Sequence, residues 1–407
     1  MRHRTVAVFG VVIGALLPAT AMASTPEPIP GASTSTSTPS TTDAGSVVGG
    51  PRLAETGFVT APGAPALPAT SAAAWVLADA DTGEVLAARD PHRKLRPAST
   101  LKTLLALTMA PRVDVTDTYV ADREDAEQEG TRVGLWPGHT YRVDDLWYAL
   151  LLKSGNDAAT ALAKAGGGTL ERGLAMMQAE ARRLQANDTT VVTPSGLDAD
   201  GQFASAYDLA LWGRAALSRG DLRHYISTIR HSFHALSVPA DSPFTDETMY
   251  VRTENRLMLN DFPGAIGVKM GYTTKAQNTM IAAAERDGRT IVATLMFTPG
   301  GRITSDAAAL LEYGFANAGR IEPVGQLVEP LSAAVVSDVD ADPAIGVSTN
   351  EAPPASSGAD AQDLLVGGVP LGWSAMTGGL VTATLLGLLT GWTLKRRRRL
   401  ARAGVYR

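Results

Sequence analysis

Ala74-Trp75-Val76-Leu77-Ala78 and Glu84-Val85-Leu86-Ala87-Ala88 flank the turn Asp81-Thr82-Gly83, and together they predict a β-hairpin. A second hairpin, with Asp287-Gly288 at its turn, is predicted over residues 279–297. Both hairpins are rich in apolar residues, so each is expected to contribute strands to a buried sheet.

The chain between the two hairpins has mostly helical periodicity, and one further helix follows the second hairpin. The expected helices span residues 98–110, 144–165, 169–185, 205–218 and 303–318. The fold class predicted from this order is α/β (α+β): an antiparallel sheet built from both ends of the domain, flanked by helices and carrying an inserted all-α subdomain. This domain is expected over about residues 71–320.

The composition excludes several classes of protein. The chain has 407 residues, of which 45% are hydrophobic and 19% charged, and its formal charge is −5. It is too hydrophobic to be wholly disordered and too weakly charged to be a basic nucleic-acid binder, so no nucleic-acid partner is expected. The absence of cysteine excludes disulfides, thiolate zinc sites and a cysteine nucleophile.

The two ends of the chain carry targeting and anchoring patterns. Residues 1–23 combine two arginines, an apolar run and a terminal Ala21-Met22-Ala23, which predicts a secretory signal peptide. Residues 371–394 are almost all apolar and would make about 36 Å of helix, enough to cross a bilayer. The basic residues 395–407 that follow predict a cytoplasmic C-terminus, so we expect a single-pass cell-membrane protein with an extracytoplasmic catalytic domain.

One linker is expected on each side of the domain. Residues 24–70 are rich in Ser, Thr, Pro, Ala and Gly, so no packed structure is predicted for them. Residues 321–370 contain eight acidic residues and no Lys or Arg, which indicates a flexible acidic stalk. The apolar stretches 324–328 and 333–336 leave open a few strands within residues 321–345. Without the nine basic residues of the two ends, the exported part has 27 basic and 41 acidic residues, a net charge of −14.

Pro97-Ala98-Ser99-Thr100-Leu101-Lys102 contains the first candidate chemistry. A helix start here places the Ser99 hydroxyl in the first turn, where backbone N–H groups and the helix dipole favour developing negative charge. Lys102 follows three residues later on the same face, and a partly desolvated lysine can act as the general base for a serine nucleophile. The competing interpretation is an N-cap serine followed by a surface lysine.

A second stretch, Leu150-Leu151-Leu152-Lys153-Ser154-Gly155-Asn156-Asp157-Ala158-Ala159, places uncharged polar side chains in a break between apolar helical segments. Gly155 is expected to permit an unusual backbone angle there. Alone, this stretch is equally consistent with a plain helix–helix turn.

A third stretch, residues 264–274, has a strand-like pattern in which Gly271 follows Lys269 by two positions. A glycine at this place lets a substrate backbone lie against the strand edge, and a lysine attracts a carboxylate.

These three elements, Ser-x-x-Lys, Ser-x-Asn and Lys-x-Gly in this order, resemble the active site of the penicillin-binding proteins and serine β-lactamases. More narrowly, the chain is similar to the D-alanyl-D-alanine carboxypeptidases of peptidase family S11, in a membrane-anchored, actinobacterial-like form. The resemblance covers nearly all of residues 71–320 and includes the non-catalytic stretches 193–198, 205–210 and 264–268.

The resemblance implies four catalytic residues. Ser99 would be the acylated nucleophile and Lys102 its base. Ser154 would pass a proton to the leaving amine, and Asn156 would hold the substrate amide.

The resemblance also implies a substrate-binding strand. Its residues are Lys269, Gly271, Tyr272 and Thr273, with Lys269 completing the electrostatic site around Ser154 and the substrate carboxylate. The backbone N–H groups of Ser99 and Tyr272 would form the oxyanion hole.

One position departs from the family pattern, because Met270 stands where the third motif usually has a threonine. The family threonine helps to bind the terminal carboxylate, and losing such a hydrogen bond costs roughly 1.5–3 kcal/mol. Reduced or altered activity is therefore one hypothesis, under which Met270→Thr should speed hydrolysis. Thr273 or Thr274 could partly replace the missing hydroxyl.

The implied function is a serine D,D-carboxypeptidase that removes the terminal D-Ala from peptidoglycan stem pentapeptides through an acyl-enzyme on Ser99 and is inhibited by β-lactams. The alternatives are D,D-endopeptidase or β-lactamase activity, or a catalytically weak penicillin-binding or cell-wall scaffold protein. No motif places the deacylating carboxylate that a β-lactamase needs. No metal or organic cofactor is implied, since His231 and His234 have the spacing of a zinc pair but no acidic third ligand in a recognisable pattern.

Overall fold

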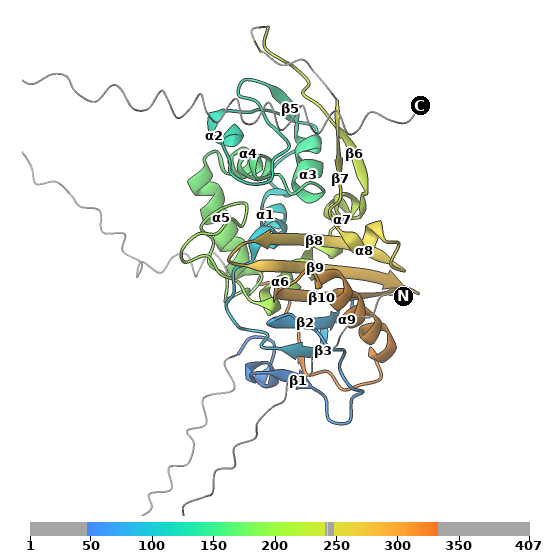
Figure 1. Cartoon of the computed structure of the whole chain (residues 1–407). Coiled ribbons are helices and arrows are strands. Elements are labelled where there is room, and N and C mark those ends of the chain that lie inside the picture. The colour runs from blue at the N-terminus through green and yellow to red at the C-terminus, as the bar shows by residue number, and fades with distance from the viewer. Residues whose placement is uncertain (1–46, 241, 243–247, 333–407) are drawn as a thin grey trace, which may run out of the picture. The chain divides into compact units, whose positions relative to one another are not determined.

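The computed structural model describes residues 47–240, 242 and 248–332. Its central feature is a seven-stranded antiparallel sheet with the strand order β1-β3-β2-β10-β9-β8, and β11 pairs with β3 as well (Figure 1). The strands of this sheet are β1 (Phe58–Thr60), β2 (Ala74–Asp79), β3 (Glu84–Arg89), β8 (Ala265–Thr273), β9 (Gln277–Arg286), β10 (Arg289–Thr298) and β11 (Gly325–Gln326). Both predicted hairpins are confirmed, and the sheet is assembled from the two ends of the domain as expected.

Each predicted helical segment is helical in the structure, with 144–165 divided in two. The α-helices are α1 (Leu101–Met109), α2 (Arg123–Ala126), α3 (Val143–Leu151), α4 (Asn156–Gly167), α5 (Leu170–Arg183), α6 (Ala206–Ser218), α7 (Gly220–Ser227), α8 (Arg256–Leu259) and α9 (Ile303–Asn317). Of these, α2, α7 and α8 were not predicted. Two 3-10 helices, η1 (Pro51–Ala54) and η2 (Ala98–Thr100), and two short two-stranded sheets complete the described part: β4 (Thr118–Val120) with β5 (Thr140–Arg142), and β6 (Arg230–Phe233) with β7 (Met249–Arg252).

The main sheet separates two hydrophobic clusters. The larger cluster joins one sheet face to the helices α1, α3, α4, α5 and α6. The smaller cluster packs α9 against the opposite face. Helices α1 and α3 to α5 gather beyond the β8 edge of the sheet, so β8 is the strand of the sheet that faces the helical subdomain (Figure 1).

The turns follow from their sequences. Asp287 and Gly288, at the β9–β10 turn, both have positive φ, 50° and 74°, as a type I′ hairpin turn requires. In the β2–β3 turn the Asp79 carboxylate accepts hydrogen bonds from the backbone N–H groups of Asp81 and Thr82, 3.0 and 3.1 Å long.

Both predicted linkers include residues that belong to the folded domain. Within 24–70, β1 pairs with β3 and buries Val59 completely. Within 321–370, β11 also pairs with β3, and Leu327 is 1% exposed. Local composition did not predict these two strands, because a short edge strand gains its stability from pairing with its neighbour. That neighbour, β3, is distant in sequence from β11, so the pairing cannot be read from local residue content.

The predicted signal peptide, membrane span and basic tail lie outside the described residues. Within the described part of the chain, every helix is too short or too polar to cross a bilayer.

Candidate active site

Ser99 lies in η2, the single 3-10 turn that leads directly into α1. The preceding carbonyl of Pro97 accepts hydrogen bonds from the hydroxyls of Thr100 and Thr279, at 2.6 and 2.8 Å. Ala98 has a positive φ of 49°. These contacts hold the turn against β9 and leave Ser99 partly exposed beside β8.

Lys102 is fully buried, and its Nζ donates three hydrogen bonds. The acceptors are Ser99 Oγ at 2.9 Å, Asn156 Oδ1 at 2.7 Å and the Ser195 carbonyl at 2.7 Å. Burial, and then the positive charge of Lys269, lower the pKa of Lys102 well below its usual value. A lysine in this state readily loses its charge, so it can accept the proton of Ser99 Oγ.

Ser154 lies in the break that divides the predicted 144–165 helix into α3 and α4, and Asn156 is the first residue of α4. The unusual backbone angle expected at Gly155 is found instead at Ser154, where φ is +65°, whereas Gly155 has φ −57°. The side-chain amide of Asn156 donates to the carbonyl of Glu129 at 2.6 Å while its oxygen accepts from Lys102, so both ends of that side chain are fixed.

Lys269 and Gly271 lie on β8, the edge strand of the sheet. Lys269 is 3% exposed, and burial lowers its pKa to about 8. A Cβ atom built on Gly271 would lie 2.6 Å from the backbone nitrogen of Ser99. Only glycine therefore lets the strand pass this close to the nucleophile.

The remaining residues of the predicted binding strand differ in their surroundings. Tyr272 is 61% exposed at the strand edge. The Thr273 hydroxyl donates to Asp198 at 2.8 Å. Met270 pairs across the sheet with Met280 and packs against the smaller hydrophobic cluster, on the α9 side of β8.

Sequence reasoning missed the contribution of residues 193–198, which were assigned to a non-catalytic stretch. The Ser195 carbonyl accepts a hydrogen bond from Lys102, and Gly196 has φ +85°. A Cβ atom on Gly196 would lie 1.8 Å from the carbonyl oxygen of Ala98. Residues 193–198 therefore pack against the turn that holds Ser99. The resemblance of this stretch to the family was the sequence signal that could have indicated its role.

Asp157 is a second residue that sequence reasoning passed over. It is fully buried, and its carboxylate accepts hydrogen bonds from the backbone N–H groups of Val133, Gly134, Leu135 and Ala158. These bonds tie the loop that contacts Asn156 to the start of α4.

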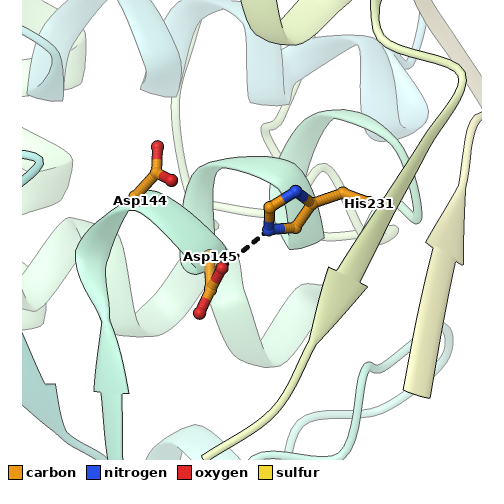
Figure 2. A group of neighbouring side chains, drawn as sticks. All are labelled: Asp144, Asp145 and His231. Atoms are coloured by element: carbon orange, nitrogen blue, oxygen red, sulfur yellow. Dashed lines mark hydrogen bonds and ion pairs between the residues drawn. The ribbon is translucent and has the colours of Figure 1, made fainter. Parts of the chain in front are cut away.

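One group of side chains among the described residues has the composition of a metal site, and it includes His231 but not His234. Ligand atoms of Asp144, Asp145 and His231 lie within 4.8 Å of one another. His231 Nε2 is 2.7 Å from Asp145 Oδ1, whereas Asp144 accepts the Tyr225 hydroxyl at 2.6 Å and points away from that pair (Figure 2). His231 and Asp145 are thus bonded to each other, and Asp144 is bonded to Tyr225.

Comparison with known proteins agrees with this geometry. The family model of the D-alanyl-D-alanine carboxypeptidases, peptidase family S11, matches residues 59–299. The D-alanyl-D-alanine carboxypeptidase DacB2 of Mycobacterium tuberculosis is 39% identical over 256 residues, which cover 61% of this chain and 84% of that protein. The carboxypeptidase DacF of Bacillus subtilis is 27% identical over 247 residues, 59% of this chain and 61% of that protein.

Solved structures give the same result. A D-alanyl-D-alanine carboxypeptidase from Mycobacterium tuberculosis aligns with a TM-score of 0.60 and 35% identity, covering 66% of this chain and 99% of the solved one. The residues matched by the family model include Ser99, Lys102 and Lys269, and the matches do not favour a scaffold protein without activity. The chain belongs to the D-alanyl-D-alanine carboxypeptidase family, peptidase family S11.

Proposed function

We infer that this protein is a serine-type D-Ala-D-Ala carboxypeptidase. The observation that carries the inference is the position of Lys102 Nζ, which lies within hydrogen-bond distance of Ser99 Oγ, Asn156 Oδ1 and the Ser195 carbonyl. This is the arrangement that a lysine-activated serine requires, in a chain of this family.

In the first half of the reaction, neutral Lys102 removes the proton of Ser99 as Ser99 Oγ attacks the carbonyl carbon of the penultimate D-Ala. The backbone N–H groups of Ser99 and Tyr272 stabilise the oxyanion, a contribution of about 3 to 4 kcal/mol for each donor where such sites have been tested. The proton held by Lys102 passes through Ser154 to the amine of the departing D-Ala, which leaves an ester on Ser99 and a neutral Lys102. In the second half, a water molecule gives a proton to Lys102 as its oxygen attacks this ester, and the shortened peptide leaves as a carboxylic acid while Ser99 Oγ takes that proton back.

The substrate peptide is proposed to lie along β8. An edge strand has one row of unpaired backbone groups, and these can pair with an extended peptide. The positive charge of Lys269 would attract the terminal carboxylate, and the absence of a side chain at Gly271 lets β8 lie directly against the backbone of Ser99.

The finer parts of the function rest on the sequence. We propose that peptidoglycan stem pentapeptides are the substrate, that β-lactams acylate Ser99, and that the domain is exported and held by residues 371–394 in the cell membrane with its C-terminus in the cytoplasm. The apolar run and the basic residues after it support the anchor.

The test is D-Ala release from a peptide ending in D-Ala-D-Ala, measured with the purified protein and its Ser99→Ala variant. We expect release by the native protein, loss of at least a thousand-fold in Ser99→Ala, and no change in Ser227→Ala, an exposed serine on α7. Mass spectrometry should place a benzylpenicillin adduct on Ser99. A penicillin adduct without any D-Ala release would reject the carboxypeptidase and support a penicillin-binding protein without turnover.

A further inference from the structure

The backbone of the nucleophile turn is in close contact with two glycines from different segments. A Cβ atom built on Gly196 would lie 1.8 Å from the Ala98 carbonyl oxygen and 3.1 Å from the Ser99 nitrogen. A Cβ atom built on Gly271 would lie 2.6 Å from the same nitrogen. The loop of residues 193–198 and the edge strand β8 therefore both pack directly against the peptide that carries the Ser99 N–H.

The same two segments are joined by a carboxylate. Asp198 Oδ1 accepts a hydrogen bond from the Thr273 hydroxyl at 2.8 Å, and its Oδ2 accepts one from the backbone N–H of Lys275 at 3.3 Å. Thr273 Oγ1 in turn accepts from the backbone N–H of Ala276 at 2.9 Å. The loop thus packs on the nucleophile turn near its middle and holds the end of β8 through Asp198.

A buried side chain fixes the backbone of this loop from inside. Gln202 is 1% exposed, and its Oε1 accepts from the backbone N–H of Thr193 at 2.7 Å. Its Nε2 donates to the Leu197 carbonyl at 2.7 Å. Because the backbone is held both before and after the contact with the Ser99 turn, the loop is a firm connection between that turn and Asp198.

These contacts surround the two groups proposed for the oxyanion hole, the N–H groups of Ser99 and Tyr272. Tyr272 lies between Gly271 and Thr273 on β8. Gly271 contacts Ser99, and Thr273 is bonded to Asp198. Since β8 is an edge strand, β9 is its one neighbour in the sheet, and the bond to Asp198 holds its end from the other direction.

We propose that Asp198 is a positioning residue of the oxyanion hole, which ties the end of β8 to the loop under the nucleophile turn and so sets the separation of the two N–H donors. This inference rests on the proposed function, because the oxyanion exists only during acylation and deacylation of Ser99. Donors act most strongly when they are already aimed at the position of the developing charge, so a small displacement of Tyr272 lowers the rate.

The first variant removes the carboxylate from the full-length protein. Asp198→Ala should lower kcat for D-Ala release, and the rate at which benzylpenicillin acylates Ser99, by roughly 10- to 100-fold, less than the loss of a whole donor. KM should change by less than about 2-fold, because the charge that attracts the substrate carboxylate is on Lys269. Asp198 is exposed, so the melting temperature should change little.

A conservative variant and a matched control make the result specific. Asp198→Asn keeps an oxygen that can accept from the Thr273 hydroxyl, so it should retain kcat within about 3-fold of the native value. Asp200→Ala removes the same type of side chain two positions later in the loop. Asp200 is 99% exposed and lies 3.5 Å from Arg96, so this variant should behave as the native protein.

The position of the oxyanion donors has its own spectroscopic signature. Hydrogen bonds to the ester carbonyl of the benzylpenicillin acyl-enzyme lower its stretching frequency, which infrared difference spectroscopy with carbonyl-labelled penicillin measures. The carbonyl band should move to higher wavenumber in Asp198→Ala and stay at the native position in Asp198→Asn and Asp200→Ala. A residue that only stabilises the fold would change the melting temperature and the yield of acyl-enzyme without moving this band.

A lower kcat together with a displaced band in Asp198→Ala, and recovery of both in Asp198→Asn, support the proposal. A native kcat, an unmoved band, or an equal loss in both variants would overturn it. If the native protein forms the penicillin adduct but releases no D-Ala, the proposed function fails by itself, while the band of the adduct still decides the role of Asp198. If no adduct forms on Ser99, both proposals fail.

Discussion

At the scale of single residues, the chemistry depends on two lysines held in different charge states. Lys102 and Lys269 are both buried, yet only Lys102 lies against the nucleophile, at 2.9 Å from Ser99 Oγ. Burial lowers the pKa of both, and the positive charge of Lys269 lowers that of Lys102 further. In the proposed mechanism, Lys102 is therefore the base, and Lys269 is the cation that attracts the substrate carboxylate.

This division predicts how substrate binding changes with pH. Lys269 is charged below its pKa of about 8 and loses its charge as the pH rises through that value. KM for a peptide ending in D-Ala-D-Ala should therefore rise above about pH 8, because the attraction for the terminal carboxylate disappears. Steady-state kinetics between pH 6 and about 10 would measure this rise in KM.

Two variants make this prediction specific to Lys269. Lys269→Met should have a high KM at every pH, whereas Lys275→Met, which removes an exposed lysine just beyond β8, should keep the native rise. A native KM that stays constant up to pH 9 would contradict the assigned role of Lys269.

At the scale of one element, the two faces of β8 have different roles: one faces the candidate active site and the other packs in the hydrophobic core. Lys269 and Gly271 pair with Ile281 and Thr279 of β9, and Thr279 reaches across to the Pro97 carbonyl below the nucleophile. Met270, one residue between them, points to the α9 side because side chains alternate along a strand. Met270, the residue that departs from the family motif, therefore packs against the smaller hydrophobic cluster and also lacks the hydroxyl of the usual threonine.

Met270→Thr should therefore have two separate effects. It should raise kcat/KM by roughly 10-fold or more if the hydroxyl binds the substrate carboxylate from the strand edge, since such a hydrogen bond contributes about 1.5–3 kcal/mol. It should also lower the melting temperature, because a partly buried apolar side chain is lost from the smaller hydrophobic cluster.

Met270→Val serves as the matched variant, since it removes similar apolar volume without adding a hydroxyl. Equal kcat/KM for Met270→Thr and Met270→Val would reject the hydroxyl explanation, and calorimetry would still measure the loss of packing.

At the scale of the whole molecule, the domain is larger than the segment with clear sequence patterns. The strands β1 and β11 both pair with β3 and close the far edge of the sheet from β8. They bury Val59 and Leu327, and the neighbouring Leu53 and Val324 are at most 3% exposed. Each such side chain contributes about 1.5–3 kcal/mol when fully buried, a large share of the 5–15 kcal/mol typical of a domain.

A fragment of residues 47–332 should therefore fold and release D-Ala, whereas a fragment of residues 71–320 should be markedly less stable. We expect the melting temperature of the shorter fragment to be lower by on the order of 10 °C or more, or the fragment not to fold. Differential scanning calorimetry of both fragments measures this difference. Equal melting temperatures would mean that β1 and β11 contribute little to the stability of the domain.

The features that the sequence determined by itself are those encoded within a few residues. The two hairpins followed from β-forming runs around Asp-Gly and Asp-Thr-Gly turns, and most helix bounds followed from apolar periodicity. The proximity of Ser99 and Lys102 was also predictable, because residues three apart share a face of a helix.

Only the tertiary structure decided what depends on contacts between distant segments. The Ser195 carbonyl reaches Lys102 from a loop whose local sequence indicates no chemistry, and Asp157 fixes the loop of residues 133–135 beside Asn156. The pairing of β1 and β11 with β3 could not be seen in composition, because an edge strand is stabilised by its neighbour. The lowered pKa values of Lys102 and Lys269 also depend on the tertiary structure. A pKa is set by burial and by nearby charges, and the burial and the neighbours of these lysines exist only once the chain has folded.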